Sequence, residues 1–389
     1  MTPAARIAAA IAVLDRIAEG EPAEKALIGW ARGARYAGSG DRAAVRDHVF
    51  QALRCWRSYA CLGGAGTGRG RMIGALRAQG IDPDSLFDGQ GHAPAPLSGA
   101  ERRAGAPPAE AADRLDLDPW LLDVFRASLG DGAEETARAL QGRAPVVLRV
   151  NLRKTDRAGA VARLAESGIS ARPDEIAATA LIVEEGARRI AGSEPYRDGQ
   201  VELQDGSSQA AMETVAPVPG ARVLDYCAGG GGKALALAAR SDVQVFAHDA
   251  APRRMADLPA RAARAGVKIT LLDGAGVAGA APFDLVLCDV PCSGSGTWRR
   301  APEAKWRLTP GALRALTRSQ DGILDTAADL AAPEGSIVYA TCSVLRDENE
   351  ARIDAFLARR PGWRLALSRR WPVSEAGDGF FVAHLSRNC

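Results

Sequence analysis

Hydrophobic residues in the first ninety positions recur every three or four residues, which is the spacing of one helical face. Ile7, Ile11 and Leu14 follow this spacing, and it returns at 45–56 after a Ser-Gly-Asp turn. The pattern predicts an all-helical domain over residues 1–88.

The pattern then changes twice. Residues 89–118 have no hydrophobic period and are rich in Gly, Ala, Pro and Arg, a composition typical of a linker. Helical spacing resumes at 119, and apolar side chains then alternate with polar ones over 146–152, as in a half-buried strand. With one more helix and strand downstream, residues 119–205 are predicted to form a helical connection and a small α+β module.

β-rich runs alternate with helical stretches through residues 206–389. Such alternation is typical of a parallel, doubly wound sheet with helices on both faces, so the sequence predicts a Rossmann-like α/β domain. The β-rich runs are 222–226, 243–247, 268–272, 283–288 and 336–340.

Composition excludes several classes of protein. At 389 residues the chain is longer than one core usually organises, and its apolar stretches are interrupted well before the ~20 residues of a membrane span. The N-terminus lacks a secretion signal pattern, so we expect a cytoplasmic protein without a membrane partner. The seven cysteines are irregularly spaced without a Cys-X-X-Cys pair, and there are only four histidines, so we expect neither a disulfide framework nor a metal site.

Charge adds little by itself. The formal net charge is +2, and arginine supplies 44 of the 49 basic residues. This bias permits phosphate recognition, although a biased genome composition explains it equally well.

A glycine-rich turn follows the first strand of the α/β domain. After Asp225, residues 227–233 read Cys-Ala-Gly-Gly-Gly-Gly-Lys and lead into a helix. Glycines at such a turn let a ligand approach the backbone at the carboxyl edge of the sheet, although a merely tight connection is the alternative interpretation. Asp249 ends the second strand, near the offset at which an acidic residue binds ribose hydroxyls.

The missing signals indicate which cofactor is bound. The turn has neither the Gly-X-Gly-X-X-Gly spacing of dinucleotide sites nor a P-loop ending, because Ala234 follows Lys233. S-adenosyl-L-methionine fits better, since it has ribose hydroxyls but no pyrophosphate to repel Asp225, Asp249 and Asp273. For Asp273 the alternative is an ordinary turn aspartate.

Two later strands each end in a cysteine motif. The fourth leads from Asp289 through Val-Pro to Cys292, and the fifth leads into Thr341-Cys342-Ser343. Both motifs lie at the same sheet edge as the glycine turn, so two thiols are expected to converge on one site. Cys288, inside an apolar strand, fits a buried small hydrophobe instead.

Methylation at carbon 5 of a pyrimidine needs a thiolate beside a methyl donor. The thiolate adds to carbon 6, which makes carbon 5 nucleophilic, and a second thiol assists the later elimination. Asp289 is placed to hold the ring edge of a base flipped out of its stack.

These motifs together resemble the RsmB/Nop family of RNA (cytosine-5) methyltransferases. The resemblance implies that Cys342 is the nucleophile, that Cys292 helps to release the product, and that Asp289 binds the base and lies against the cofactor. The matching stretches are 147–151, 204–209, 227–233, 289–296, 341–343, 348–350 and 379–383. The cofactor-binding residues that it implies are Cys227, Ala228, Gly229, Gly230, Gly231, Gly232, Lys233, Asp249, Asp273 and Asp289.

The resemblance also implies a fold and a partner. The family has a Rossmann-like methyltransferase domain after a module similar to an RNA-recognition fold, and the N-terminal helices resemble the NusB-like domain of ribosomal members. We therefore expect a monomer that acts on ribosomal RNA.

One departure from the family leaves alternatives open. The family's loop usually reads Cys-Ala-Ala-Pro-Gly-Gly-Lys-Thr, whereas Gly229, Gly230 and Ala234 replace Ala, Pro and Thr here. Loss of the proline frees the loop, at a cost of ~1 kcal/mol. The alternatives are a catalytically weak or inactive RNA-binding assembly factor, a tRNA-directed methyltransferase, and an enzyme in which Cys292 attacks, as in DNA cytosine methyltransferases.

Cations and aromatic residues follow the first cysteine motif. Arg299, Arg300 and Lys305, with Trp298 and Trp306, are predicted to contact RNA phosphates and to stack on bases. The alternative is a solvated loop with Trp306 in the core.

Overall fold

The computed structural model describes residues 1–388, so Cys389 of the predicted last domain lies outside the described residues. The chain forms two compact units, and each is described by itself. One comprises Met1–Arg143 with Trp298–Arg307, and the other comprises Ala144–Thr297 with Leu308–Cys389.

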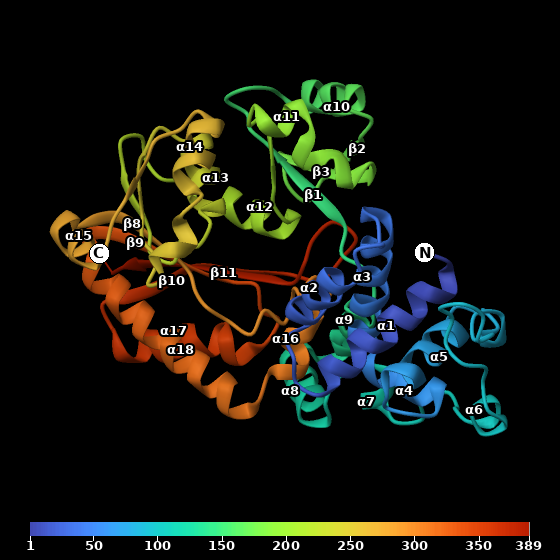
Figure 1. Ribbon diagram of the computed structural model, residues 1–389. Coiled ribbons are helices and arrows are strands. Elements are labelled where there is room, and N and C mark those ends of the chain that lie inside the picture. Colours follow the sequence, from blue (N-terminus) through green and yellow to red (C-terminus); the bar gives the residue numbers. More distant parts are fainter. Residues whose placement is uncertain (389) are drawn as a thin grey trace. The chain divides into compact units, whose positions relative to one another are not determined.

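The first unit is built from helices, as the N-terminal pattern predicts (Figure 1). Apolar faces of α1, α3 and α5 form its core, with Leu14, Leu53 and Ile73 fully buried. Its helices are α1 (Pro3–Ala18), α2 (Ala23–Gly33), α3 (Ser39–Arg54), α4 (Trp56–Gly63), α5 (Gly68–Ala78), α6 (Gly99–Arg103), α7 (Ala111–Arg114), α8 (Pro119–Leu129), α9 (Ala133–Ala139) and α16 (Pro302–Arg307).

Residues 298–307 return to this helical unit from the middle of the α/β domain. The Trp298 ring stacks on Phe125 with ring centroids 5.7 Å apart. Trp306 Nε1 donates a hydrogen bond to the Leu53 carbonyl at 2.7 Å. Two tryptophans therefore hold the segment on the helices.

The predicted linker lies within the same unit. Segment 89–118 contains α6 and α7, and Glu101 forms an ion pair with Arg69 of α5 at 2.6 Å. Arg77 donates to the carbonyl of Ala104. These polar contacts hold the segment although it has no hydrophobic period. The first compact unit runs to Arg143, and the predicted domain bounds stay predictions.

The small α+β module is present as predicted. Its strands form an antiparallel sheet in the order β2-β3-β1-β4, and Leu148 and Val150 of β1 pack with Leu164 of α10. The elements are β1 (Val146–Val150), α10 (Arg157–Glu166), β2 (Ser170–Pro173), β3 (Ala180–Glu185), α11 (Glu194–Arg197) and β4 (Val201–Leu203).

The large sheet has the order β10-β11-β9-β8-β5-β6-β7, and all five predicted runs are strands within it. Strands β9, β8, β5, β6 and β7 are parallel, which confirms the Rossmann-like prediction for them. The strands are β5 (Arg222–Asp225), β6 (Gln244–Ala247), β7 (Ile269–Leu271), β8 (Phe283–Asp289), β9 (Ala331–Thr341), β10 (Trp363–Trp371) and β11 (Phe380–Arg387).

The last two strands make the sheet mixed instead of wholly parallel. β11 pairs antiparallel with both β9 and β10. No helix separates β10 from β11, so the chain reverses through the short connection 372–379 where a parallel crossover would need more residues.

Helices cover both faces of this sheet (Figure 1). Because strand side chains alternate, Leu287 and Val338 pack with α12 and α13, whereas Val286 and Ile337 pack with α17 and α18. The helices are α12 (Gly206–Glu213), α13 (Gly232–Arg240), α14 (Leu258–Ala265), α15 (Gly274–Ala280), α17 (Pro310–Leu330) and α18 (Glu350–Arg359).

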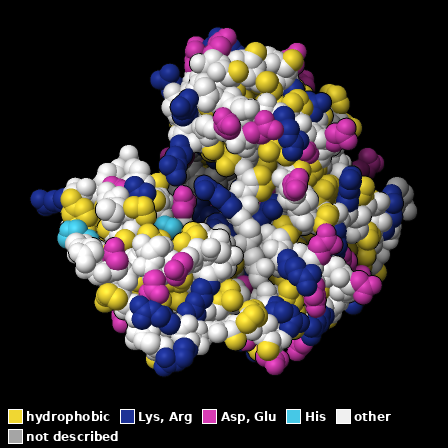
Figure 2. Space-filling model, turned by 90° about the vertical axis from the view of Figure 1, so that its right-hand side faces the viewer, with side chains coloured by type: hydrophobic (Ala, Val, Ile, Leu, Met, Phe, Trp, Pro, Cys, Tyr) yellow, Lys and Arg dark blue, Asp and Glu magenta, His cyan; other side chains and the backbone are white. Residues whose placement is uncertain are grey.

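The surface is mixed in charge. Figure 2 shows basic and acidic side chains interspersed over one face, in keeping with the formal net charge of +2. No helix among residues 1–388 is long and apolar enough to cross a membrane.

Candidate active site

Two cysteine side chains meet beyond neighbouring parallel strands. β8 and β9 pair so that Asp289 lies opposite Ala340. Cys292 lies in the loop after β8, Cys342 directly follows β9, and their sulfur atoms lie 3.5 Å apart. The structure therefore brings the two predicted thiols together.

The two thiols differ in acidity. The hydrogen bond between the two sulfurs, in which either thiol could donate, lowers the pKa of Cys342 and raises that of Cys292. Burial and Asp289 act against ionisation of Cys342, and the Lys233 ammonium favours it. Since the thiolate is the nucleophilic form, these shifts favour ionisation of Cys342 over Cys292.

An ion pair joins the glycine turn to this site. Lys233 Nζ lies 2.6 Å from Asp289 Oδ2. Burial opposes the charge of Lys233, but the Asp289 carboxylate outweighs burial and raises the pKa of Lys233. The ammonium also lies 5.2 Å from the centre of the Phe380 ring, a cation–π contact. A fixed cation thus lies close enough to Cys342 to act on its pKa.

A buried carboxylate ties the two cysteine loops together. Glu348, in the 3-10 helix η5 (Arg346–Glu348), is fully buried. It accepts hydrogen bonds from the Ser293 N–H at 2.8 Å and from the Ser343 hydroxyl at 2.5 Å. The Gln320 amide donates to it at 3.1 Å. Each serine follows one of the two cysteines, so Glu348 fixes both loops.

Sequence reasoning missed this role for Glu348. The signal available was the Glu-Asn-Glu run at 348–350, which matches the family without indicating a function. Asn349 adds to the same network, since its Oδ1 accepts from the Thr341 hydroxyl at 2.6 Å and its amide donates to the Ser343 carbonyl at 2.9 Å.

Asp225 offers an unpaired acceptor beside the glycine turn. Its Oδ2 accepts from the Ala234 N–H at 3.2 Å, whereas its buried Oδ1 has no hydrogen-bond partner in the described part of the chain. Burial, helped by the nearby Asp289 charge, raises the pKa of Asp225 to about 7. An orphaned acceptor at a strand end fits a ligand with hydroxyl or ammonium donors, as S-adenosylmethionine has.

The predicted cofactor-binding residues all lie at this carboxyl edge: Asp289 ends β8, and the others follow β5, β6 or β7. Asp249 accepts from the Gly229 N–H at 2.9 Å. Asp273 is exposed and caps α15 by accepting from the Gly276 N–H at 2.6 Å, so the turn interpretation also accounts for it. Cofactor contact by these residues remains a prediction.

Two further predictions concern the buried cysteine of β8 and the side chains that could bind a metal ion. Cys288 is fully buried, as predicted for a small hydrophobe, and burial raises its pKa well above the usual range. Within residues 1–388, no three metal-ligating side chains cluster as a metal site requires.

The sequence predicts RNA contact for five residues, and the prediction is wrong for all of them except Arg300. The five are Trp298, Arg299, Arg300, Lys305 and Trp306. Trp298, Arg299 and Lys305 are buried, and Trp306 is engaged with the helical core. Burial lowers the pKa of Lys305 to about 8. The aromatic residues and cations fill the helical unit, and only Arg300 among them is exposed.

Arg300 lines a basic cavity within the helical unit. The cavity has a volume of about 360 Å³. Its basic lining residues are Arg46, His48, Arg54, Arg143 and Arg300. Asp47 also lines it and forms an ion pair with Arg143 at 3.6 Å.

Two family models match the chain from residue 118 onward. Residues 212–386 match the 16S rRNA methyltransferase RsmB/F model, and residues 118–188 match the ferredoxin-like domain of RsmF/B-like methyltransferases.

Relatives extend the similarity. A ribosomal RNA small subunit methyltransferase B from Xylella fastidiosa is 36% identical over 287 residues, 69% of this chain and 66% of the relative. The protein of the same name from Xanthomonas campestris is 34% identical over 294 residues, 70% of this chain and 67% of the relative. The chain thus spans about two thirds of the length of these relatives.

Solved structures share the fold. The crystal structure of PH0851 has a TM-score of 0.77 at 24% identity, covering 100% of this chain and 99% of that chain. A methyltransferase homolog from Pyrococcus horikoshii has a TM-score of 0.62 at 24% identity, covering 71% of this chain and 97% of that chain. Taken with the family models and the relatives, the fold and site show that the chain belongs to the RsmB/F family of S-adenosylmethionine-dependent methyltransferases.

Proposed function

We propose that the protein methylates carbon 5 of a cytosine in ribosomal RNA, with Cys342 as the nucleophile. The observation that carries this proposal is the pair of thiols 3.5 Å apart, in which Cys342 is the more acidic. The ribosomal substrate rests on the names of the relatives.

The covalent step begins at Cys342. Its thiolate forms a bond to carbon 6 of the ring, and the ring's electrons move toward carbon 5. S-adenosylmethionine, when bound, supplies an electrophilic methyl group on a sulfonium. Carbon 5 would accept that methyl group, and the remaining thioether would be the leaving group. The carbon-5 proton then passes to water, and its electron pair restores the double bond between carbons 5 and 6. The bond between sulfur and carbon 6 breaks, and its electron pair returns to the Cys342 sulfur.

Cys292 acts on the departing sulfur. Its sulfur lies 3.5 Å from the Cys342 sulfur, so the protonated thiol of Cys292 is within reach to donate to, and stabilise, the thiolate that leaves carbon 6. Its raised pKa keeps the proton on Cys292 while Cys342 carries the charge.

Asp289 selects the base. Its carboxylate is held by Lys233 at the end of β8, and it accepts a hydrogen bond from the exocyclic amino group of cytosine. Uracil has an acceptor at that position and is disfavoured. Asp225, Asp249 and the 227–233 turn would hold S-adenosylmethionine.

RNA contact outside the active site is assigned to the basic cavity of the helical unit. Arginines that line a cavity of about 360 Å³ suit backbone phosphates, because guanidinium groups bind phosphate in a fixed geometry.

Nucleoside mass spectrometry tests the proposal. Ribosomal and transfer RNA would be compared from cells with the gene intact, deleted, and restored as wild type or Cys342→Ala. We expect 5-methylcytosine to disappear from ribosomal RNA on deletion and to return only with the wild-type gene. Loss from transfer RNA instead would overturn the ribosomal substrate. Unchanged pools would overturn the activity and favour an assembly factor.

A further inference from the structure

Side chains from other elements contact the glycine turn at 229–232 and restrain its backbone. We propose that Arg261 is a positioning residue that fixes this turn for S-adenosylmethionine. The inference rests on the family's cofactor and not on the proposed RNA substrate.

Four consecutive glycines make the turn intrinsically loose. Gly229 and Gly231 adopt positive φ values of 51° and 77°, which glycine tolerates best. Glycine also loses more backbone entropy than other residues when it is ordered. A turn of this composition needs restraint before it can present its backbone to a ligand.

Arg261 supplies restraint at the centre of the turn. Its Nη1 donates a hydrogen bond to the Gly230 carbonyl. A Cβ atom built on Gly230 would lie 2.8 Å from that nitrogen, so the guanidinium packs directly against the turn. Gly230 is also where the family usually has proline, so the arginine restrains the position that has lost its stiff residue.

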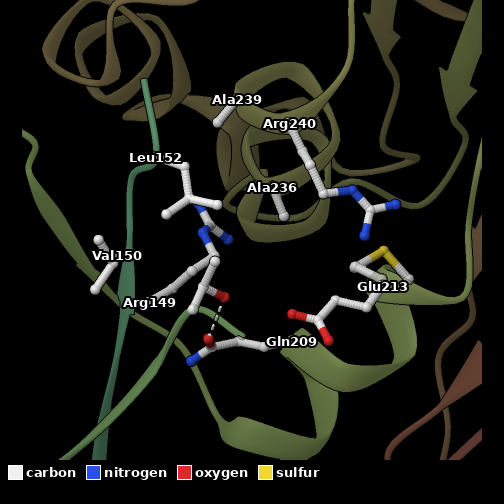
Figure 3. Close-up of a pocket in the computed structure, with 10 residues that line it drawn as sticks. Arg149, Val150, Leu152, Gln209, Glu213, Ala236, Ala239 and Arg240 are labelled. Carbon is white, nitrogen blue, oxygen red and sulfur yellow. Dashed lines mark hydrogen bonds between the residues drawn. The ribbon is translucent and has the colours of Figure 1, made fainter. Parts of the chain in front are cut away.

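Neighbouring contacts fix the rest of the turn. Arg149 Nη1 donates to the Gly232 carbonyl at 2.8 Å. A Cβ atom on Gly231 would lie 2.2 Å from Leu258 Cδ1, which closes the space beneath the turn. Figure 3 shows the Arg149 side chain reaching from β1 toward helix α13.

Arg261 is itself anchored by the small α+β module. Glu202 of β4 lies 3.5 Å from Arg261 Nε and accepts from Arg264 Nη2 at 2.7 Å. Glu202 is only 8% exposed, so the surrounding residues restrict the motion of its carboxylate. β4 therefore holds Arg261, and Arg261 holds the turn.

Calorimetry with S-adenosylmethionine and the full chain tests this role without RNA. Arg261→Ala should raise Kd about tenfold, equivalent to about 1.4 kcal/mol, with the unfolding temperature nearly unchanged. Arg253→Ala is the matched control, since Arg253 is an exposed arginine of the 3-10 helix η4 (Pro252–Met255) that precedes α14. It should leave Kd unchanged.

Rescue distinguishes positioning from a general structural role. Gly230 does not share the positive φ of its neighbours, so Gly230→Pro should stiffen the turn and recover most of the affinity lost in Arg261→Ala. An unchanged Kd in Arg261→Ala would overturn the proposal. A weakened Kd that Gly230→Pro does not recover would overturn it as well. Because no RNA is present, neither result depends on the proposed methylation.

Discussion

The sulfur atoms of Cys292 and Cys342 lie 3.5 Å apart although 50 positions separate the residues in the chain. Parallel pairing of β8 with β9 brings the two loops together, and Glu348 holds them there. The same hydrogen bond shifts the two thiol pKa values in opposite directions, down for Cys342 and up for Cys292.

Removal of Cys292 should trap the reaction. In Cys292→Ala the departing thiolate loses its hydrogen-bond donor, so the covalent RNA adduct on Cys342 should decay at least about tenfold more slowly. A denaturing gel with labelled RNA and S-adenosylmethionine would show a slowly migrating band. Cys61→Ala, in the helical unit, serves as the control without a band. Normal turnover without adduct in Cys292→Ala would contradict the assignment.

Removal of the Lys233 charge should shift the pH at which Cys342 reacts. The ammonium lowers the pKa of Cys342, so Lys233→Gln should raise that pKa. Alkylation of Cys342 by iodoacetamide, followed by peptide mass spectrometry across pH, measures the midpoint. The exposed Lys268→Gln should not move it. A midpoint unchanged in both variants would show that Lys233 does not act on the thiol.

Asp225 should make stability depend on pH. Its pKa of about 7 in the fold exceeds the usual 3.8, so the folded chain retains a proton that the unfolded chain releases. The contribution of Asp225 to stability is therefore full below about pH 4 and is lost as the pH rises through 7. Asp225→Asn should remove this loss. Between pH 4 and pH 8, the free energy of unfolding of the wild type should therefore fall by more than that of the variant, by at most about 4 kcal/mol.

Urea unfolding at both pH values measures the Asp225 effect. The exposed Asp242→Asn, in the same domain, is the control and should follow the wild type. Asp225→Asn should also weaken S-adenosylmethionine binding above pH 7, where the carboxylate that it removes is charged. Identical pH dependence in wild type and Asp225→Asn would contradict the raised pKa.

Truncation of Glu348 should loosen both cysteine loops. Glu348→Ala leaves buried donors of Ser293, Ser343 and Gln320 without their acceptor, so the free energy of unfolding should fall by about 3 kcal/mol. Urea denaturation measures the loss. The exposed Glu375→Ala should have little effect. A loss below about 0.5 kcal/mol for Glu348→Ala would show that the network contributes little.

The basic cavity should contribute to RNA affinity through salt-dependent contacts. Arg300→Glu and Arg143→Glu should each weaken RNA binding and reduce the slope of log affinity against log salt by about one. Filter binding over a salt series measures the slope. Lys305→Ala is included as a contrast, because Lys305 is buried in the helical unit. It should lower the unfolding temperature of that unit. An unchanged slope in both arginine variants would remove the cavity from the RNA interface.

The spacing of hydrophobic residues along the chain was sufficient to predict much of the fold. It predicts β5 to β9 and the small α+β module, because alternating burial follows directly from which residues are apolar. It also predicts that the glycine turn and both cysteine motifs share an edge, since carboxyl ends of parallel strands lie together. It does not predict the antiparallel β10 and β11, which follow from a short reversal without a crossover helix.

Contacts between residues far apart in the chain were decided only by the tertiary structure. Trp306 reaches the backbone of Leu53, so residues read as an RNA-binding loop are part of a helical core. Glu348 links two loops, and Arg261 holds Gly230. The sequence by itself determined which chemical groups are present and at which strand ends they lie. Their acidity and their partners depend on burial and on single hydrogen bonds, which leave no periodic trace in the chain.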